Sequence, residues 1–386
     1  MSLKTRLGWG LILFSGCLAA QDVVTNPRLP PAPEAGRVVT LRPEEAVKPG
    51  KGPSALRKPM ALAVAPDGSL IFQEGVRLVK FDAAGNFVRE LFSGASGKTV
   101  MVGDSSSGSR RQIAQSGLSF LVRGSEVVLL DLNAGAIRIL DLDGKSITDI
   151  PLEEPIMGGR LVMAGEDRYL VSGRLFPSSA GPMMRDPSLF SVSGKGAVSA
   201  PMAVFSSRVV PVSDVQDGPI RTTQVQMMGA LTVALRGDRA YVNHTPEFQV
   251  TALDLQTGKI LRVFQRAFDR VENDDAQASP AGLSVSGMTV SPPRLKLKND
   301  ISGLFPRENL LWIMTSTQDK TKGTLVDVFD DEGRYLDCFY LKAEIDGLPY
   351  AFSGAQTWIF GDEVYFAAAQ ADGTSRILKS ALDKGL

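Results

Sequence analysis

The chain has very few of the residues on which disulfide frameworks and thiol or histidine catalysis depend. Its 386 residues include two cysteines, Cys17 and Cys338, and one histidine, His244. Cys17 belongs to the leader described below, so Cys338 has no partner for a disulfide within an exported chain. A catalytic thiol needs a nearby histidine, so we expect Cys338 to be a buried, small hydrophobic residue. The fold must then be stabilised by its core, which a chain of this length can build.

The chain also has no net charge and no long apolar run after its first twenty residues. Lys+Arg and Asp+Glu both number 42, so the formal net charge is zero at pH 7. This balance argues against nucleic-acid binding, whose affinity comes from neutralising phosphates. It also argues against attachment to an anionic membrane by charge alone. After the first twenty residues there is no run of 18 or more apolar residues, so the sequence predicts no transmembrane span.

Residues 1–20 have the pattern of a signal peptide. Lys4 and Arg6 precede the apolar run 7–14, which is too short to cross a bilayer. Two ways of processing remain open: cleavage after Ala20, or lipidation of Cys17 in a sequence that resembles a bacterial lipobox (Phe-Ser-Gly-Cys). Both imply export, to the periplasm, to the outside, or to a lipid anchor in the cell envelope. Membrane contact is expected only if Cys17 is lipidated.

Turn-forming residues are abundant, with 38 glycines and 23 prolines. A β-rich run, a tight polar turn and a second β-rich run recur six times, with a mean spacing of about 59 residues, close to the period of large propeller blades. The six turns are Pro66-Asp67-Gly68, Arg123-Gly124-Ser125, Gly165-Glu166-Asp167, Arg236-Gly237-Asp238, Arg307-Glu308-Asn309 and Gly361-Asp362-Glu363. The sequence therefore predicts an all-β, six-bladed β-propeller of four-stranded antiparallel blades.

The last unit lacks a strand, and the chain before the first unit has one to spare. Three β-runs of the sixth unit are present before the sequence stops at Leu386, whereas the run 37–41 has no local partner. Pairing the two would close the ring and remove an exposed sheet edge. We therefore expect a Pro-rich tether at 21–57 that contains the closing strand near 37–41, and a propeller at 58–386.

One stretch resembles a known family. The strand 63–65, the turn Pro66-Asp67-Gly68 and the later hairpin Phe81-Asp82-Ala83-Ala84-Gly85 are similar to NHL-type six-bladed propellers, closely over residues 60–91 and only loosely elsewhere. The resemblance supports the fold. It implies little about function, because such propellers include lyases, lactonases, peptide binders and RNA binders.

Loop length distinguishes the two faces of the predicted ring. The turns between first and second strands, and between third and fourth strands, are short throughout. The long insertions all fall in the second-to-third turns and the connections between blades, at residues 93–116, 174–187, 206–228, 265–300 and 317–323. Insertions confined to one face of a repeat protein usually form its binding surface.

Several cationic residues fall on or beside this face, and guanidinium groups suit carboxylates and acidic partners. The candidate binding residues are Arg110, Arg111, Arg174, Arg185, His244, Arg266 and Arg270. No catalytic residue, metal site or cofactor is identified. The acidic residues Glu272, Asp274 and Asp275 lack the spacing of a cation-binding loop.

Two functions remain open. The first is an exported, non-catalytic scaffold that recognises a protein, peptide or glycan through the long-loop face. The alternative is a metal-dependent hydrolase or lyase, like the lactonase propellers, with its site at the mouth of the central channel. The alternative needs carboxylate, Asn or His side chains on the innermost strands, where the sequence is mainly apolar. We therefore expect the binding function.

Overall fold

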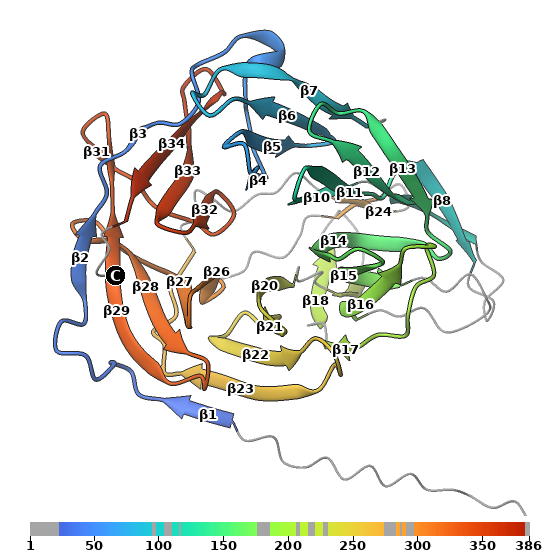
Figure 1. Ribbon diagram of the computed structural model, residues 1–386. Coiled ribbons are helices and arrows are strands. Elements are labelled where there is room, and N and C mark those ends of the chain that lie inside the picture. The colour runs from blue at the N-terminus through green and yellow to red at the C-terminus, as the bar shows by residue number, and fades with distance from the viewer. Residues whose placement is uncertain are drawn as a thin grey trace, which may run out of the picture.

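Six antiparallel sheets stand around a central axis, as expected (Figure 1). The computed structural model describes residues 23–94, 98–103, 110–115, 117–175, 186–205, 209–214, 221–226, 231–273, 283–285, 288–290 and 297–382. Within them the one helical element is a single 3-10 turn, η1 (Gly52–Ser54). The protein is thus an all-β, six-bladed β-propeller, which confirms the predicted fold.

Each blade runs from an innermost strand beside the axis to an outermost strand at the rim. Blade 1 contains β4 (Ala61–Val64), β5 (Leu70–Glu74), β6 (Arg77–Phe81) and β7 (Phe87–Ser93). Blade 2 contains β10 (Leu118–Arg123), β11 (Glu126–Asp131), β12 (Ala136–Asp141) and β13 (Ser146–Pro151). Blade 3 contains β14 (Ile156–Ala164), β15 (Arg168–Leu175), β16 (Ser188–Ser193) and β17 (Ala203–Val204).

The second half of the ring repeats this order. Blade 4 contains β20 (Thr232–Arg236), β21 (Arg239–Asn243), β22 (Gln249–Asp254) and β23 (Ile260–Arg266). Blade 5 contains β26 (Ile301–Arg307), β27 (Leu310–Asp319), β28 (Gly323–Asp330) and β29 (Tyr335–Lys342). Blade 6 begins with β32 (Thr357–Phe360), β33 (Glu363–Ala369) and β34 (Ser375–Ala381). All six predicted turns join a first strand to a second strand.

The N-terminal segment forms a belt around the outside of blades 4, 5 and 6. Strand β1 (Val23–Asn26) runs parallel to β23, and β2 (Arg37–Thr40) runs parallel to β29. The two-residue strand β3 (Glu44–Glu45) pairs antiparallel with β34 and completes blade 6 (Figure 1). The ring is closed by an N-terminal strand as expected, but the prediction placed that strand at 37–41, which was wrong: β2 instead adds a fifth strand to blade 5.

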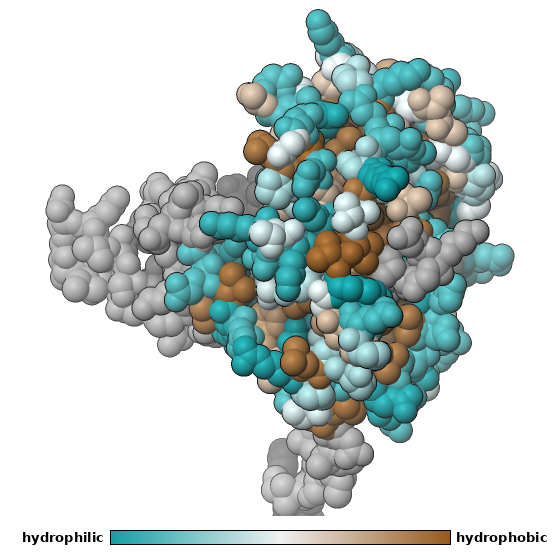
Figure 2. All heavy atoms as spheres, turned by 90° about the vertical axis from the view of Figure 1, so that its left-hand side faces the viewer, coloured by the Kyte–Doolittle hydropathy of each residue, from teal (hydrophilic) through white to brown (hydrophobic). Residues whose placement is uncertain are grey.

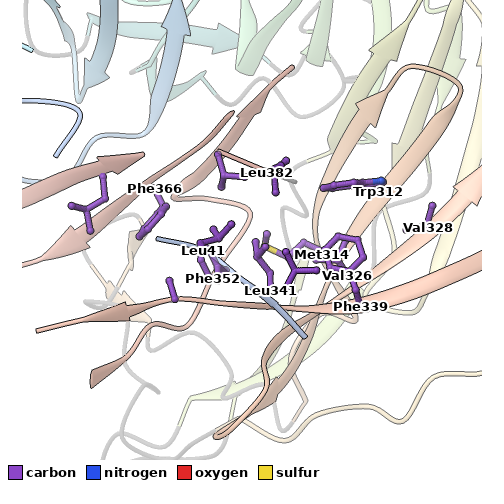
Figure 3. Packing of buried hydrophobic residues seen from close by; sticks show 14 of the residues in the cluster. Leu41, Trp312, Met314, Val326, Val328, Phe339, Leu341, Phe352, Phe366 and Leu382 are labelled. Carbon is purple, nitrogen blue, oxygen red and sulfur yellow. The ribbon is translucent and has the colours of Figure 1, made fainter. Parts of the chain in front are cut away.

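Burial explains this pairing. Leu41, just after β2, is buried at the junction of blades 5 and 6, where it packs with Phe352, Phe366 and Leu341 (Figure 3). Ala46 and Val47, just after β3, are buried at the junction of blades 6 and 1. The belt therefore passes β29 before it reaches β34, because Leu41 and then Ala46 and Val47 fill successive gaps between blades.

The belt supports a test with two adjacent residues of β2. Val39 is 8% exposed, whereas Val38 is 43% exposed. Val39→Ala is expected to lower the free energy of unfolding by about 1–2 kcal/mol, because two buried methyl groups are lost. Val38→Ala is expected to change it by less than about 0.5 kcal/mol. Equal effects in guanidinium unfolding would show that β2 does not occupy this register.

The turn between the third and fourth strands of a blade packs against the preceding blade. In blade 2, the Asp141 carboxylate accepts hydrogen bonds from the N–H groups of Asp143 (2.9 Å) and Lys145 (2.8 Å), which closes the turn. Gly144 in that turn lies against the backbone of Leu91, on the outermost strand of blade 1. In the equivalent turns of blades 3 and 4, Gly196 and Gly258 also lie against backbone atoms of the preceding blade. Gly85 of blade 1 lies against the backbone of the belt at Ala46 and Val47, and Gly333 of blade 5 lies against the side chain of Phe264.

The rim beside the belt is mainly polar. Figure 2 views the molecule from the side that carries β2 and shows a largely hydrophilic surface, with hydrophobic residues in small separate groups. Val38 is one of the exposed apolar residues of this side. A partner that bound here would meet little contiguous apolar surface.

Candidate functional site

The connections between blades carry extra hairpins. Because strands alternate in direction, these connections and the second-to-third turns lie on one face of the ring, here called the long-loop face. The hairpins are β8 (Lys98–Gly103) with β9 (Arg110–Gln115), β18 (Val209–Asp214) with β19 (Arg221–Gln226), β24 (Leu283–Val285) with β25 (Met288–Val290), and β30 (Glu344–Ile345) with β31 (Leu348–Pro349).

Three of these hairpins lie in insertions that the sequence predicted for this face. The fourth, β30–β31, was missed because its strands are only two residues long. The available sequence signal was the Asp346-Gly347 pair, which is typical of a tight hairpin turn. In the structure both residues have the positive φ that such a turn requires (52° and 78°). Conversely, most of the predicted insertion 317–323 is strand, because β27 and β28 remain paired as far as Asp319 and Gly323.

A pocket of about 340 Å³ opens on the long-loop face at blade 5, between the connections that lead into and out of this blade. Three segments form it: the connection after blade 4, the turn between β27 and β28, and the connection that contains β30 and β31. Its lining residues are Val271, Glu272, Lys298, Gln318, Asp319, Lys320, Thr321, Gly323, Thr324, Lys342, Ala343, Pro349, Tyr350 and Ala351. Three lysines thus face two acidic residues, beside an aromatic ring and several apolar side chains.

The polar groups at the base of the pocket are held by the fold. The Asp319 carboxylate accepts hydrogen bonds from the Thr321 hydroxyl (2.7 Å) and from the N–H groups of Thr321 and Lys322, which lower its pKa to about 2. The Tyr350 hydroxyl donates to the carbonyl of Ala367 (2.8 Å), and burial raises its pKa to about 12. The Tyr350 ring therefore borders the pocket as a fixed neutral wall.

Two of the pocket lysines, Lys342 and Lys320, are held less tightly. Lys342 Nζ lies 3.1 Å from the Glu344 carboxylate, whose side chain is 56% exposed. Lys320 is exposed and makes no ion pair with any residue that the structure describes. Such a pocket suits a ligand with a ring or another apolar body that also carries acidic groups, because flexible ammonium groups can reach an anion from several sides.

Arg266 is one of two predicted binding residues that the structure buries. It is 8% exposed, and its guanidinium lies 2.7 Å from the fully buried carboxylate of Asp327 in blade 5. The rings of Phe248, Phe268 and Tyr335 surround its guanidinium carbon at 4.8–5.2 Å. Arg266 thus forms a buried ion pair between blades 4 and 5.

Arg270 lies further along the same connection. Its Nε donates to Asp300 (3.0 Å), and Glu247 is 3.6 Å from another of its nitrogens. Burial raises the pKa of Asp300, and the charge of Arg270 opposes that rise. Asp300 also accepts from the N–H of Phe248 (2.9 Å), so Arg270 and Asp300 together tie the long connection to blade 4.

Arg174 and His244 occupy other parts of the same face. Arg174, near the end of β15, is 7% exposed; burial lowers its pKa, and the negative charge of Asp186 opposes this. His244 follows β21 and is partly buried with its ring 5.0 Å from that of Phe205, and burial lowers its pKa. Of these predicted residues, Arg266 and Arg270 lie near one another at the end of blade 4, whereas Arg174 lies on blade 3.

The remaining predicted residues are described only in part or not at all. Arg110 and Arg111 belong to β9, of which only the backbone is described, and β9 contacts β14 of blade 3. Arg185 and Cys17 lie outside the described residues.

Arginine is the one type of charged residue on the innermost strands. They contain no Asp, Glu, Asn, Lys or His, and their only charged residues are Arg123, Arg160, Arg236 and Arg307. Neither Arg160 nor the pocket lysines 298, 320 and 342 were predicted as site residues from the sequence. The available signals were Arg160 directly after two glycines, and the Lys-rich turn 320–322. Neither identifies a site without the fold.

The chain resembles solved propellers in fold but not in sequence. No family model and no curated protein matches it. A Bacteroides fragilis protein described as exported aligns with a TM-score of 0.51 at 12% identity, covering 94% of this chain and 100% of that chain. A member of the DUF4221 family from Bacteroides vulgatus has a TM-score of 0.48 at 9% identity, covering 89% and 98%.

A gluconolactonase from Xanthomonas campestris aligns with a TM-score of 0.40 at 13% identity, covering 90% of this chain and 98% of that chain. At 12% identity, the similarity to the Bacteroides fragilis structure shows the fold alone. The NHL resemblance therefore stays a prediction. Among the described residues, no helix has the length and apolar character needed to cross a membrane.

Proposed function

We propose that this protein is an exported, non-catalytic propeller that recognises an acidic glycan, peptide or protein through its long-loop face. The observation that carries the proposal is the pocket at blade 5, formed by three long-loop segments with three lysines beside Tyr350. The four added hairpins enlarge the same face. Export is supported by the leader pattern in residues 1–20, and by the likeness to a protein described as exported.

The composition of the innermost strands favours binding over the lactonase-like alternative. A divalent cation prefers carboxylate, carbonyl and imidazole ligands. The six innermost strands offer no such side chain, whereas their four charged residues are all arginines.

Binding to glycan arrays and displayed peptide libraries tests the proposal with two charge-matched variants. The first variant replaces Lys298, Lys320 and Lys342 of the pocket with Gln. The control replaces Lys145, Lys195 and Lys259 with Gln, three exposed lysines in third-to-fourth turns on the opposite face. Both variants lower the net charge by the same amount, so a difference between them reports position rather than total charge.

The wild-type protein is expected to bind a limited set of acidic ligands. The pocket variant is expected to lose at least about tenfold in affinity, because each charge-assisted contact contributes a sizeable part of the binding free energy. The control variant should bind as the wild type does. Equal loss in both variants, or no selective binding by the wild type, would contradict the proposal.

A further inference from the structure

The three segments around the pocket at blade 5 differ in chemistry. The connection that contains β30 and β31 supplies a mainly apolar wall, formed by Ala343, Pro349, Tyr350 and Ala351. The turn between β27 and β28 supplies a wall rich in polar side chains, among them Gln318, Asp319, Lys320, Thr321 and Thr324. The connection after blade 4 supplies Val271, Glu272 and Lys298. A ligand that fills this pocket therefore needs an apolar side and a side with several polar groups.

The apolar wall is held in place by its own contacts. The Tyr350 N–H donates to the Ala343 carbonyl (2.9 Å), which closes the hairpin between these two residues. The Tyr350 ring packs against Phe352 and Phe366, with ring centroids 4.8 and 4.9 Å away. Its hydroxyl already donates to Ala367, so the ring offers the pocket carbon surface rather than a donor. This wall suits an apolar face of a ligand, because burying carbon surface is favourable.

The polar wall contains a fixed hydrogen-bond acceptor. The three hydrogen bonds that Asp319 accepts within its own turn lower its pKa, so it is ionised at neutral pH. An ionised carboxylate can accept about four hydrogen bonds and donates none. Gln318 stands beside it, is exposed, and makes no side-chain hydrogen bond within the described part of the chain. A ligand at this wall therefore needs hydrogen-bond donors, such as hydroxyl groups.

One cation of the pocket is available to an anion. Lys342 lies 3.1 Å from Glu344, whereas Lys320 is exposed and has no ion pair with a residue that the structure describes. Two carboxylates, those of Asp319 and Glu272, line the same pocket. A ligand with several anionic groups would meet these carboxylates, and like charges in a binding site are costly. A single acidic group pairs with Lys320 and keeps this repulsion small.

The size of the pocket favours one ring-sized unit. Its volume of about 340 Å³ is near the lower end of the range of about 300–1,000 Å³ for small-molecule sites. An extended peptide instead needs a groove or a sheet edge along several residues. An acidic side chain of a peptide would bring a carboxylate but no donor for Asp319. A pyranose brings both, because its C–H groups form an apolar face and its hydroxyls surround the ring.

We propose that the pocket at blade 5 binds a pyranose that carries a single carboxylate. The C–H face of the ring packs against the wall that contains Tyr350, its hydroxyls donate to Asp319, and its carboxylate pairs with Lys320. A carboxylate bonded to the ring keeps the ligand compact, whereas a sulfate or phosphate ester adds a longer arm. The inference rests on the proposed function, because it names the ligand class of the same pocket.

Methyl glycosides of uronic acids and of sialic acid test the assignment in the full-length protein. Three comparison probes each lack one feature: methyl glucoside lacks the acid, cyclohexanecarboxylate lacks the hydroxyls, and gluconate lacks the ring. Glucose 6-sulfate carries an ester in place of the carboxylate. A uronic-acid trisaccharide distinguishes a residue of a polysaccharide from a free sugar acid. Affinities are measured by ligand-observed NMR.

Two pocket variants and one matched control accompany the probes. Lys320→Gln removes the available cation, and Gln318→Ala removes the amide beside Asp319. Lys145→Gln is the control, because Lys145 is also an exposed lysine of a tight turn without an ion pair to a described residue, but lies on the opposite face. All three positions are exposed, so the folded protein should tolerate the changes.

At least one carboxylated pyranose is expected to bind the wild type, and each comparison probe and the sulfate ester should bind at least about tenfold more weakly. Lys320→Gln should weaken the carboxylated pyranose at least about fivefold, because a charge-assisted contact is lost. Gln318→Ala should weaken it about threefold or more without affecting cyclohexanecarboxylate. Lys145→Gln should bind as the wild type does. Tighter binding of the trisaccharide indicates a polysaccharide ligand, and equal binding indicates a free sugar acid.

The assignment is overturned if no carboxylated pyranose binds, alone or in the trisaccharide, if a comparison probe or the sulfate ester binds as tightly, or if Lys320→Gln and Lys145→Gln behave alike. Its failure is separable from failure of the proposed function. On the arrays, selective binding of acidic peptides that is lost in the pocket-lysine variant would leave the long-loop function standing and remove the sugar acid from it.

Discussion

Replacing Asp327 with Asn is expected to lower the free energy of unfolding by about 3–5 kcal/mol, because it leaves the buried charge of Arg266 without a counter-charge. Asp327 has no exposed surface, and Arg266 Nε and the Tyr335 hydroxyl each donate to it at 2.7 Å. Burial raises the pKa of Asp327, and the Arg266 charge opposes that rise. Denaturant unfolding with circular dichroism measures the effect.

An exposed ion pair supplies the control. Lys379 Nζ lies 3.3 Å from Glu44, whose side chain is 71% exposed. Glu44→Gln is expected to cost between 0 and about 1 kcal/mol, as is usual for surface pairs. Adding Arg266→Met to Asp327→Asn should recover part of the lost stability, since it removes the unpaired charge. Similar costs for Asp327→Asn and Glu44→Gln would show that the junction of blades 4 and 5 does not depend on this pair.

Gly144→Ala is expected to destabilise the protein by about 2–5 kcal/mol. A residue other than glycine in the left-handed region costs about 1–2 kcal/mol, and Gly144 has a φ of 82°. In addition, a Cβ here would lie 2.6 Å from the carbonyl oxygen of Leu91 in the neighbouring blade. Because that atom belongs to the backbone, relief requires the two blades to separate, which adds about 1–3 kcal/mol, as overpacking usually does.

Gly124 in the same blade separates the two contributions. It also has a positive φ, of 56°, but a Cβ there would meet nothing within 4 Å. Gly124→Ala is therefore expected to cost only about 1–2 kcal/mol. If the two variants have the same unfolding midpoint, the turn glycines do not determine the distance between blades.

Most of the fold could be predicted because its signals are local. Four of the six turns contain a glycine with positive φ (Gly68, Gly124, Gly237 and Gly361), and β-rich runs lie on either side of every turn, so the six turns could be counted directly. The same count placed the long insertions on one face. The position of the closing strand could not be predicted in this way, because β3 has only two residues and both are charged glutamates.

The candidate site residues were harder to predict because their environment depends on distant parts of the chain. Arg266 and Arg160 are both arginines on strands, and nothing in their local sequence tells which one is buried. Asp327 lies 61 residues after Arg266, yet their contact buries both side chains. The pocket lysines come from three segments whose proximity follows only from the order of the blades.

The sequence by itself determined the repeat, the number of blades, the face with the long loops and the leader pattern, because each depends on residues within a few positions of one another. The tertiary structure decided which strand closes the ring, which cations are neutralised inside it and which remain available. Those outcomes depend on burial between neighbouring blades and on carboxylates supplied by other blades, and neither is a property of a local sequence.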